Sequence, residues 1–279
     1  MKATRITFDL ETYRTTNPDA VARIRQEAID KEPAGNTLKA LKEAWNTTKA
    51  REARASQALA KTSLDPMLAE ILCVCLLVDF PDSTTADGTY DLMAPSDTLA
   101  SLRTVLDNNT DENTLWIGHN IAGFDLPILL NSWRRAQIPP PTHFPVFRNG
   151  HWRGCYYDTM QHIPNNRAGY VSLDSACQAF GLGSAKTIDW NGPPMEGSRV
   201  AEAYEAGCYD LIMRYCAQDV HIERALYLCL TAGGRYGTPE AQRADLRASI
   251  AEIEANPDLS DDAKAITIGN LVRRELYAA

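Results

Sequence analysis

The strongest constraint on the fold is an uninterrupted apolar run in the first third of the chain. Residues 70–79 read Glu-Ile-Leu-Cys-Val-Cys-Leu-Leu-Val-Asp. A continuous run of this length, rich in branched side chains, predicts a β-strand at the centre of a sheet that is covered on both faces. The run is too short to cross a bilayer and ends in an acidic residue, so we expect no membrane anchor here.

Strand and helix patterns alternate on both sides of this run. Further strands are expected at residues 4–10, 90–93, 115–117 and 153–157. Expected helices cover about residues 18–32, 37–61, 96–106, 123–130, 171–180 and 203–230, the last with an interruption near Gly207. This alternation predicts an α/β core, with the two helices of residues 14–63 as an insertion between the first two strands. Residues 238–279 read as a helix pair, so we expect a domain at 1–235 and a helical extension at 236–279.

The charge is unevenly spread. The net charge is −8, which argues against a protein that coats nucleic acid in general. Residues 14–63 nevertheless carry ten Lys and Arg against six Asp and Glu. These basic side chains either hold a phosphate backbone or form an ordinary solvated helix surface.

Composition indicates an ordinary globular chain. Of its 279 residues, 44% are hydrophobic and 23% charged, which excludes a mostly disordered protein. The seven cysteines are scattered without paired zinc spacing, so we expect free and mostly buried thiols. The first residues lack the apolar stretch of a signal peptide, so we expect a cytoplasmic location.

Two acidic residues stand close together at the end of the first expected strand. Asp9 and Glu11 flank Leu10, and alternate side chains of a strand point to the same face. Two such carboxylates repel each other, so one takes up a proton unless a cation neutralises them. A solvated strand end, followed by a turn at Thr12, explains this pair equally well when it is taken alone.

Two further acidic residues follow apolar elements later in the chain. Asp125 lies near a helix start, after a glycine turn, which suits a metal-ligating carboxylate at the rim of a sheet. Tyr215 and Asp219 are four residues apart on an expected helix and share one face, where phenol and carboxylate can hold a water between them. The competing explanations are a helix N-terminal acid and an ordinary core tyrosine with an exposed aspartate.

Taken together, the four carboxylates would bring about four negative charges to one edge of an α/β sheet. Divalent cations are the simplest remedy, and oxygen-only ligands favour Mg²⁺ or Mn²⁺ over Zn²⁺. Two such ions, roughly 3.5–4 Å apart, can clamp the attacking and leaving oxygens of a phosphodiester. The sequence therefore predicts a two-cation site at Asp9, Glu11, Asp125 and Asp219.

These segments resemble the three exonuclease motifs of the DEDD superfamily of 3′–5′ exonucleases, which have a ribonuclease-H-like fold. The motifs are Phe8-Asp9-Leu10-Glu11-Thr12, His119-Asn120 with Phe124-Asp125, and Tyr215 with Asp219. The Tyr-x-x-x-Asp spacing resembles the DEDDy branch, since the DEDDh branch would have histidine where this chain has Arg214. Residues 157–160, 172–174 and 181–183, with Lys186, are similar to exonuclease domains related to family-B DNA polymerases. The resemblance covers about residues 4–230.

The resemblance implies a fold, a reaction and a role for each residue. The fold would be a ribonuclease-H-like mixed β-sheet flanked by helices. The reaction would be removal of nucleoside 5′-monophosphates from the 3′ end of DNA, mainly single-stranded, with two Mg²⁺ or Mn²⁺ ions. Asp9 would bridge both ions. Glu11 and Asp219 would complete the coordination of the ion that activates water, and Asp125 would hold the second ion largely through water. Tyr215 would orient the attacking water. The candidate substrate contacts are Leu10, Thr12, His119, Asn120, Phe124 and Lys186.

Several alternatives remain open at this point. A 3′–5′ exoribonuclease would use the same carboxylates, and no residue reports on the 2′-hydroxyl. A nucleic-acid-binding module could keep the fold without the chemistry. An aspartate-nucleophile phosphatase would need aspartate in place of Glu11 and would leave Asn120 and Tyr215 without a role. His119 also fits a structural role, Lys186 also fits a plain surface lysine, and the sequence leaves the oligomeric state undetermined.

Overall fold

A five-stranded mixed sheet forms the centre of the molecule. The computed structural model describes residues 2–32, 43–82, 85–91, 95–163, 170–185, 187–231 and 254–255. The sheet has the spatial order β3-β2-β1-β4-β7. Its strands are β1 (Arg5–Tyr13), β2 (Glu70–Asp79), β3 (Thr85–Asp91), β4 (Leu115–Gly118) and β7 (Tyr156–Asp158). β2 is antiparallel to β1 and β3, whereas β4 is parallel to β1 and to β7.

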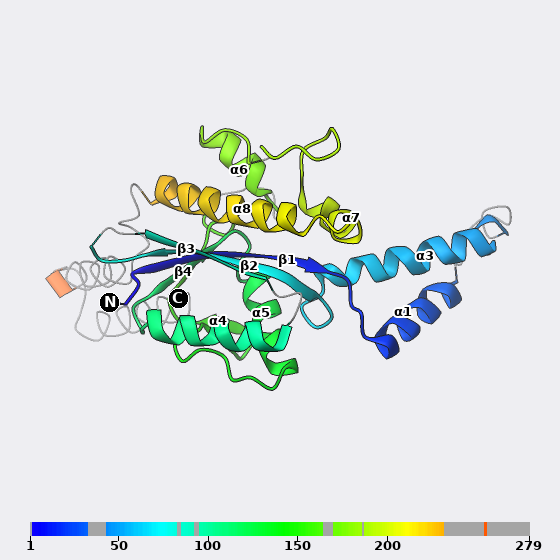
Figure 1. Cartoon of the computed structure of the whole chain (residues 1–279), viewed down its shortest axis with the longest axis horizontal. Helices are drawn as coiled ribbons and strands as arrows, with labels where there is room; N and C mark the ends of the chain where they lie inside the picture. The colour runs from blue at the N-terminus through cyan, green and yellow to red at the C-terminus, as the bar shows by residue number, and fades with distance from the viewer. Residues whose placement is uncertain are drawn as a thin grey trace.

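Helices cover both faces of this sheet. One face carries α6 (Leu173–Ala179), α7 (Val200–Glu205) and α8 (Tyr209–Leu230), and the other carries α4 (Pro95–Asn109) and α5 (Asp125–Arg135) (Figure 1). Two short 3₁₀ helices, η1 (Lys61–Leu64) and η2 (Gly197–Arg199), complete the connections. The predicted fold class, a ribonuclease-H-like mixed sheet flanked by helices, is confirmed.

Alternation along the two central strands divides the core into two layers. On β1, Phe8 and Leu10 pack in the layer of α4 and α5. Tyr13 packs in the layer of α7 and α8, together with Cys73 and Cys75 of β2. Because successive strand side chains point to opposite faces, Asp9 and Glu11 lie on the α8 face. The predicted common face of these two acids is therefore present, and it is a buried one.

The helical insertion after the first strand is confirmed within the described residues. Its helices α1 (Pro18–Asp30) and α3 (Thr48–Ala60) lie side by side and project away from the sheet (Figure 1). Asn17 caps α1, because its side chain accepts from two backbone N–H groups of the first turn. The single helix expected over residues 37–61 is interrupted in its described part. Residues 43–45 are helical, but Thr47 adopts an extended backbone and caps a new helix start, so α3 begins at residue 48.

Three other local expectations need correction. The edge strand β3 starts at residue 85, earlier than expected, because an edge strand pairs through its backbone and needs no apolar pattern. The strand expected at 153–157 is two strands, since Gly154 has a φ of +117° and separates β6 (His151–Arg153) from β7. The hairpin of β5 (Val146–Arg148) and β6 was not expected, although its Asn149-Gly150 turn is typical of one.

Some predictions fall outside the described residues or stay untested. The C-terminal helix pair of residues 238–279 and Lys186 lie outside them, apart from residues 254–255. The domain boundary at 235/236 stays a prediction. The expected interruption near Gly207 is present between α7 and α8, where this glycine has a φ of +73°. Among the described helices, none is long and apolar enough to span a membrane.

Candidate active site

Three carboxylates meet between the sheet and α8. Asp9 and Glu11 come from β1, and Asp219 comes from the middle of α8. Their carboxylate oxygens lie within 4.8 Å of one another. Glu11 and Asp219 are each only 9% exposed. Two of the expected motifs are thus brought together by the packing of one helix on one strand.

The fourth predicted carboxylate enters from the opposite helix layer. Asp125 is the first residue of α5, is 2% exposed, and has a buried Oδ1 without a hydrogen-bond partner among the described residues. Burial raises the pKa of Asp125, and the backbone N–H groups of Asp125 itself and of Leu10 partly offset that rise. The contact with Leu10 joins α5 to the strand that carries Asp9 and Glu11. Asp125 therefore borders the trio without being part of it.

The sheet opens at this point because two parallel strands differ in length. β4 pairs with β1 only from Arg5 to Thr7. β1 continues to Tyr13, and its register with β2 shifts between Glu11 and Thr12, which is a β-bulge. Bulges bend a strand and re-aim its side chains, and they are common beside active sites. The free part of β1 faces the turn after β4, which is where the second motif lies.

Like charges and burial act together on the carboxylates. Burial, followed by the charges of Glu223, Glu11, Asp125 and Asp219, raises the pKa of Asp9. Burial raises the pKa of Asp219 to about 7. Buried carboxylates that repel one another must be protonated or neutralised by cations. The site is therefore built for positive charge.

The phenol of Tyr215 stays protonated beside Asp219. Burial, then the charges of Asp219, Glu11 and Asp9, and finally a hydrogen bond to Asp219 raise the pKa of Tyr215. That hydrogen bond lowers the pKa of Asp219 in turn. A phenol in this state donates a hydrogen bond and is a poor general base.

A fifth carboxylate, that of Glu223, was not predicted from the sequence. Glu223 lies one helical turn beyond Asp219 on α8 and is 3% exposed. Its Oε1 accepts from the backbone N–H of His119 at 2.9 Å, and its Oε2 has no partner among the described residues. The signal was present in the sequence, since Tyr215, Asp219 and Glu223 follow one another at four-residue intervals and share a helix face.

The turn between β4 and α5 is organised by Asp158, which is fully buried at the end of β7. Its carboxylate accepts from the backbone N–H groups of Asn120 at 2.9 Å and Ala122 at 3.2 Å. Asn120 has a φ of +62°, and its Oδ1 would lie 2.6 Å from any Cβ added at Gly123. Asp158 therefore supports the turn that carries Asn120.

Other predicted substrate contacts are engaged within the protein. Leu10 is buried in the core, and Phe124 is partly buried and packs against the same core. The Thr12 hydroxyl donates to the Ser63 carbonyl at 2.7 Å. Both ring nitrogens of His119 have protein partners, which are the Thr159 hydroxyl and the Val171 carbonyl. Substrate contact by Leu10 and Thr12 would therefore have to use their backbone.

The donor set fits hard divalent cations. The trio offers only oxygen atoms, and Asp125 and Glu223 each add a buried oxygen without a partner. Oxygen donors of this kind suit Mg²⁺ or Mn²⁺. Three buried thiols, those of Cys73, Cys75 and Cys216, also lie within 4.8 Å of one another. Burial raises the pKa of Cys216, so in the metal-free protein this thiol is a neutral neighbour of the trio.

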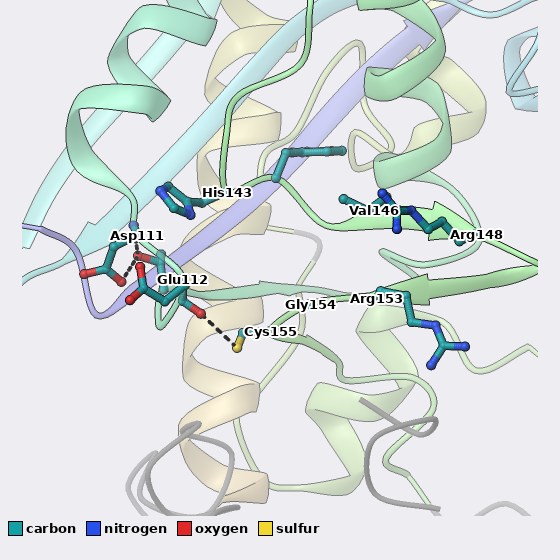
Figure 2. A pocket seen from close by; sticks show the side chains of 10 residues that line it. Asp111, Glu112, His143, Val146, Arg148, Arg153, Gly154 and Cys155 are labelled. Carbon is teal, nitrogen blue, oxygen red and sulfur yellow. Dashed lines mark hydrogen bonds between the residues drawn. The ribbon is translucent and has the colours of Figure 1, made fainter. Parts of the chain in front are cut away.

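A separate pocket lies at the other end of β4. It measures about 370 Å³ and includes side chains of both charges, as Figure 2 shows. Asp111 and Glu112 precede β4, whereas Arg148 and Arg153 belong to the β5–β6 hairpin. None of the predicted site residues lines this pocket.

Comparisons with known proteins do not assign this chain to a family. No family model and no curated protein matches the chain. Among solved structures, the chain is similar to the family B DNA polymerase of the hyperthermophilic archaeon Pyrobaculum calidifontis, with a TM-score of 0.49 and 14% identity. The match covers 98% of this chain and 29% of the polymerase chain.

Proposed function

We propose that this protein is a metal-dependent 3′–5′ exonuclease that acts mainly on single-stranded DNA and releases nucleoside 5′-monophosphates. The observation that carries this proposal is the meeting of Asp9, Glu11 and Asp219, whose carboxylate oxygens lie within 4.8 Å of one another in a largely buried site. Asp125 and Glu223 each add a buried oxygen that lacks a partner among the described residues. A site that gathers so much negative charge is suited to cations and a phosphodiester.

The residues that would hold the cations are Asp9, Glu11 and Asp219, with Asp125 as a further ligand. Bound Mg²⁺ or Mn²⁺ would neutralise these carboxylates and stabilise the charge that develops on a phosphate under attack. The chain itself contributes the spacing, because β1, α5 and α8 fix the acids before substrate arrives. Such preorganisation supplies much of the rate enhancement of many enzymes.

Tyr215 would orient the attacking water. In the metal-free protein its neutral phenol donates directly to Asp219. The same hydroxyl would donate to an attacking water placed between the two and would fix the orientation of that water. The water gives up one proton to solvent as its oxygen forms a bond to the phosphorus of the last phosphodiester, and the bond from that phosphorus to the 3′ oxygen of the preceding nucleotide breaks. The shortened strand takes up a proton at its 3′ oxygen, and a nucleoside 5′-monophosphate leaves.

The α1–α3 hairpin offers a surface for the rest of the nucleic acid, because it extends from the same end of β1 as the acidic trio. Its charges are not equally available, however. Arg54 donates to the carbonyls of Trp45, Ala28 and Ile29, and Arg25 pairs with Glu52. The phosphate backbone of the nucleic acid would therefore be contacted by other basic side chains of the hairpin, such as Lys49.

The test is degradation of end-labelled oligonucleotides with Mg²⁺ or Mn²⁺, with and without a chelator. We expect a 5′-labelled strand to shorten progressively, a 3′-labelled strand to release mononucleotide at once, and circular single-stranded DNA to stay intact. Asp9→Asn should abolish the reaction. The matched control is Asp210→Asn, which changes an exposed acid in the first turn of α8.

Hydrolysis rates of DNA and RNA strands of the same sequence show which polymer is the substrate. A clear preference for RNA would replace the deoxyribonuclease by an exoribonuclease. Binding of oligonucleotides without metal-dependent cleavage would leave only a binding module. Rapid hydrolysis of a small phosphomonoester, with polymers untouched, would favour a phosphatase.

A further inference from the structure

One large aromatic side chain beside the carboxylates has no role in the site described so far. Tyr170 directly precedes the turn into α6 and is 71% exposed, more than any other large hydrophobic side chain among the described residues. Its hydroxyl has no hydrogen-bond partner among those residues either. An aromatic face presented to solvent next to a catalytic centre is a surface on which a nucleobase can stack.

The backbone next to Tyr170 is tied to the active-site turn. The carbonyl of Val171 lies 2.6 Å from Nε2 of His119, and the Thr159 hydroxyl lies 2.9 Å from Nδ1 of the same ring. Burial lowers the pKa of His119, so the ring is neutral. A carbonyl can only accept, so the Nε2 nitrogen carries the proton and donates it to Val171.

The next residue is fixed as well. Ser172 caps α6, since its side chain accepts from the backbone N–H of Ser175 at 3.2 Å. Two consecutive residues after Tyr170 are thus held in place, one by the active-site turn and one by a helix start. The tyrosine backbone is anchored while its ring stays in solvent.

The hydroxyl end of Tyr170 lies in the field of the whole acidic site. The carboxylates of Asp125, Asp9, Asp219 and Glu223 all act electrostatically on its phenol. These four acids come from α5, β1 and α8, so the phenol lies within electrostatic reach of all three elements. A neutral ring at that place would not compete for cations and would not attract phosphate.

We propose that Tyr170 is a substrate-contacting residue whose ring stacks on the terminal base of a single-stranded nucleic acid, while the adjoining phosphodiester lies over the carboxylates. This inference deepens the proposed function and rests on it. Stacking accepts every base, because all bases have a π-face. Tyr170 would thus hold the 3′ end without sequence preference.

The experiment compares Tyr170→Ala and Tyr170→Phe with the unchanged protein. Steady-state hydrolysis of a single-stranded oligonucleotide gives KM and kcat. Binding is measured with Ca²⁺ in place of Mg²⁺ on a strand with 2-aminopurine at its 3′ end, whose fluorescence reports stacking of that base. Tyr209→Ala is the matched control, because Tyr209 is also exposed, at 42%, but lies at the start of α8.

We expect Tyr170→Ala to raise KM about 5- to 150-fold, the range that corresponds to the loss of one base-stacking contact. The kcat should change little, because stacking stabilises the ground state and the transition state alike. Tyr170→Phe should keep KM and the 2-aminopurine signal near those of the unchanged protein, and so should Tyr209→Ala.

The outcomes separate this inference from the function on which it rests. An unchanged KM and an unchanged fluorescence signal in Tyr170→Ala would overturn the stacking role and leave the exonuclease intact. A loss in Tyr170→Phe as large as in Tyr170→Ala would overturn it too, because the hydroxyl would then be the contact. A Tyr170-dependent stacking signal without any hydrolysis would support the stacking role and remove only the exonuclease.

Discussion

Removing divalent cations should make the stability of this protein fall as the pH rises. Burial raises the pKa of Asp219 from 3.8 to about 7. Between these values the folded protein binds a proton that the unfolded chain has lost, so the free energy of unfolding decreases with pH. The stabilisation is complete below about pH 4 and is gone above about pH 7. Burial raises the pKa of Asp9 and Glu11 as well, so they act in the same direction.

The magnitude follows from the size of the rise. At about 1.4 kcal/mol for each pH unit, Asp219 alone accounts for roughly 4 kcal/mol. In a chain of this size that corresponds to a fall in Tm of roughly 8–16 °C. Bound Mn²⁺ should restore about 2.7 kcal/mol at a concentration of about 100 times its Kd, because it binds only the folded state.

Thermal unfolding followed by circular dichroism, from about pH 4 to about pH 8, measures the effect with a chelator and with Mn²⁺. The curves of Tm against pH with chelator and with Mn²⁺ should meet at the acidic end and separate as the pH rises. Asp219→Asn should flatten the chelator curve, while Asp210→Asn should not. A chelator curve that is already flat in the unchanged protein would refute the reasoning, because the carboxylates would then be solvated in the metal-free state.

Four further outcomes are expected. Asp9→Asn should keep the circular dichroism spectrum and lower kcat for oligonucleotide hydrolysis by at least about 10³-fold; near-native turnover would contradict its role. Tyr215→Phe should cost less than about 100-fold in kcat, because it removes an orienting group and no cation ligand. Glu223→Gln keeps an acceptor for the backbone N–H of His119 but removes a carboxylate, so calorimetry should show weaker Mn²⁺ binding. An unchanged affinity would show that Glu223 does not contribute to cation binding. Arg54→Ala should speed proteolysis within the α1–α3 hairpin, whereas Lys49→Ala should leave proteolysis unchanged and lower the salt slope of DNA binding by about 1.

Hydrophobic patterning was sufficient to predict the centre of the sheet. The run at 70–79 is the strand β2, with the same bounds, because a strand buried on both faces has apolar side chains at nearly every position. Strands that are held mainly by backbone pairing have no such apolar run. The edge strand β3 has few apolar residues, and the short strands β5 and β6 depend on the Asn149-Gly150 turn more than on their side chains.

The acidic trio followed from the sequence because each of its acids ends or interrupts an apolar element. What the sequence could not give was the pairing of side chains with backbone groups far away in the chain. Asp158 organises the turn at Asn120 through backbone N–H groups, and Glu223 does the same at His119. The four-residue spacing on α8 indicates which face carries Glu223, but the distant backbone N–H groups that these two carboxylates bind are not indicated by any local pattern.

The position of the trio explains why metal and stability should be coupled here. Asp9 and Glu11 lie opposite Cys75 and Cys73 in the register of β1 and β2, on a face that otherwise buries thiols and leucines. A sequence optimised for folding alone would place apolar side chains at both positions, since burying a charge without a partner is costly. Departures from consistent patterning are expected where function demands them. The loss of folding stability that these two acids cause in the metal-free protein therefore indicates how much the site depends on bound cations.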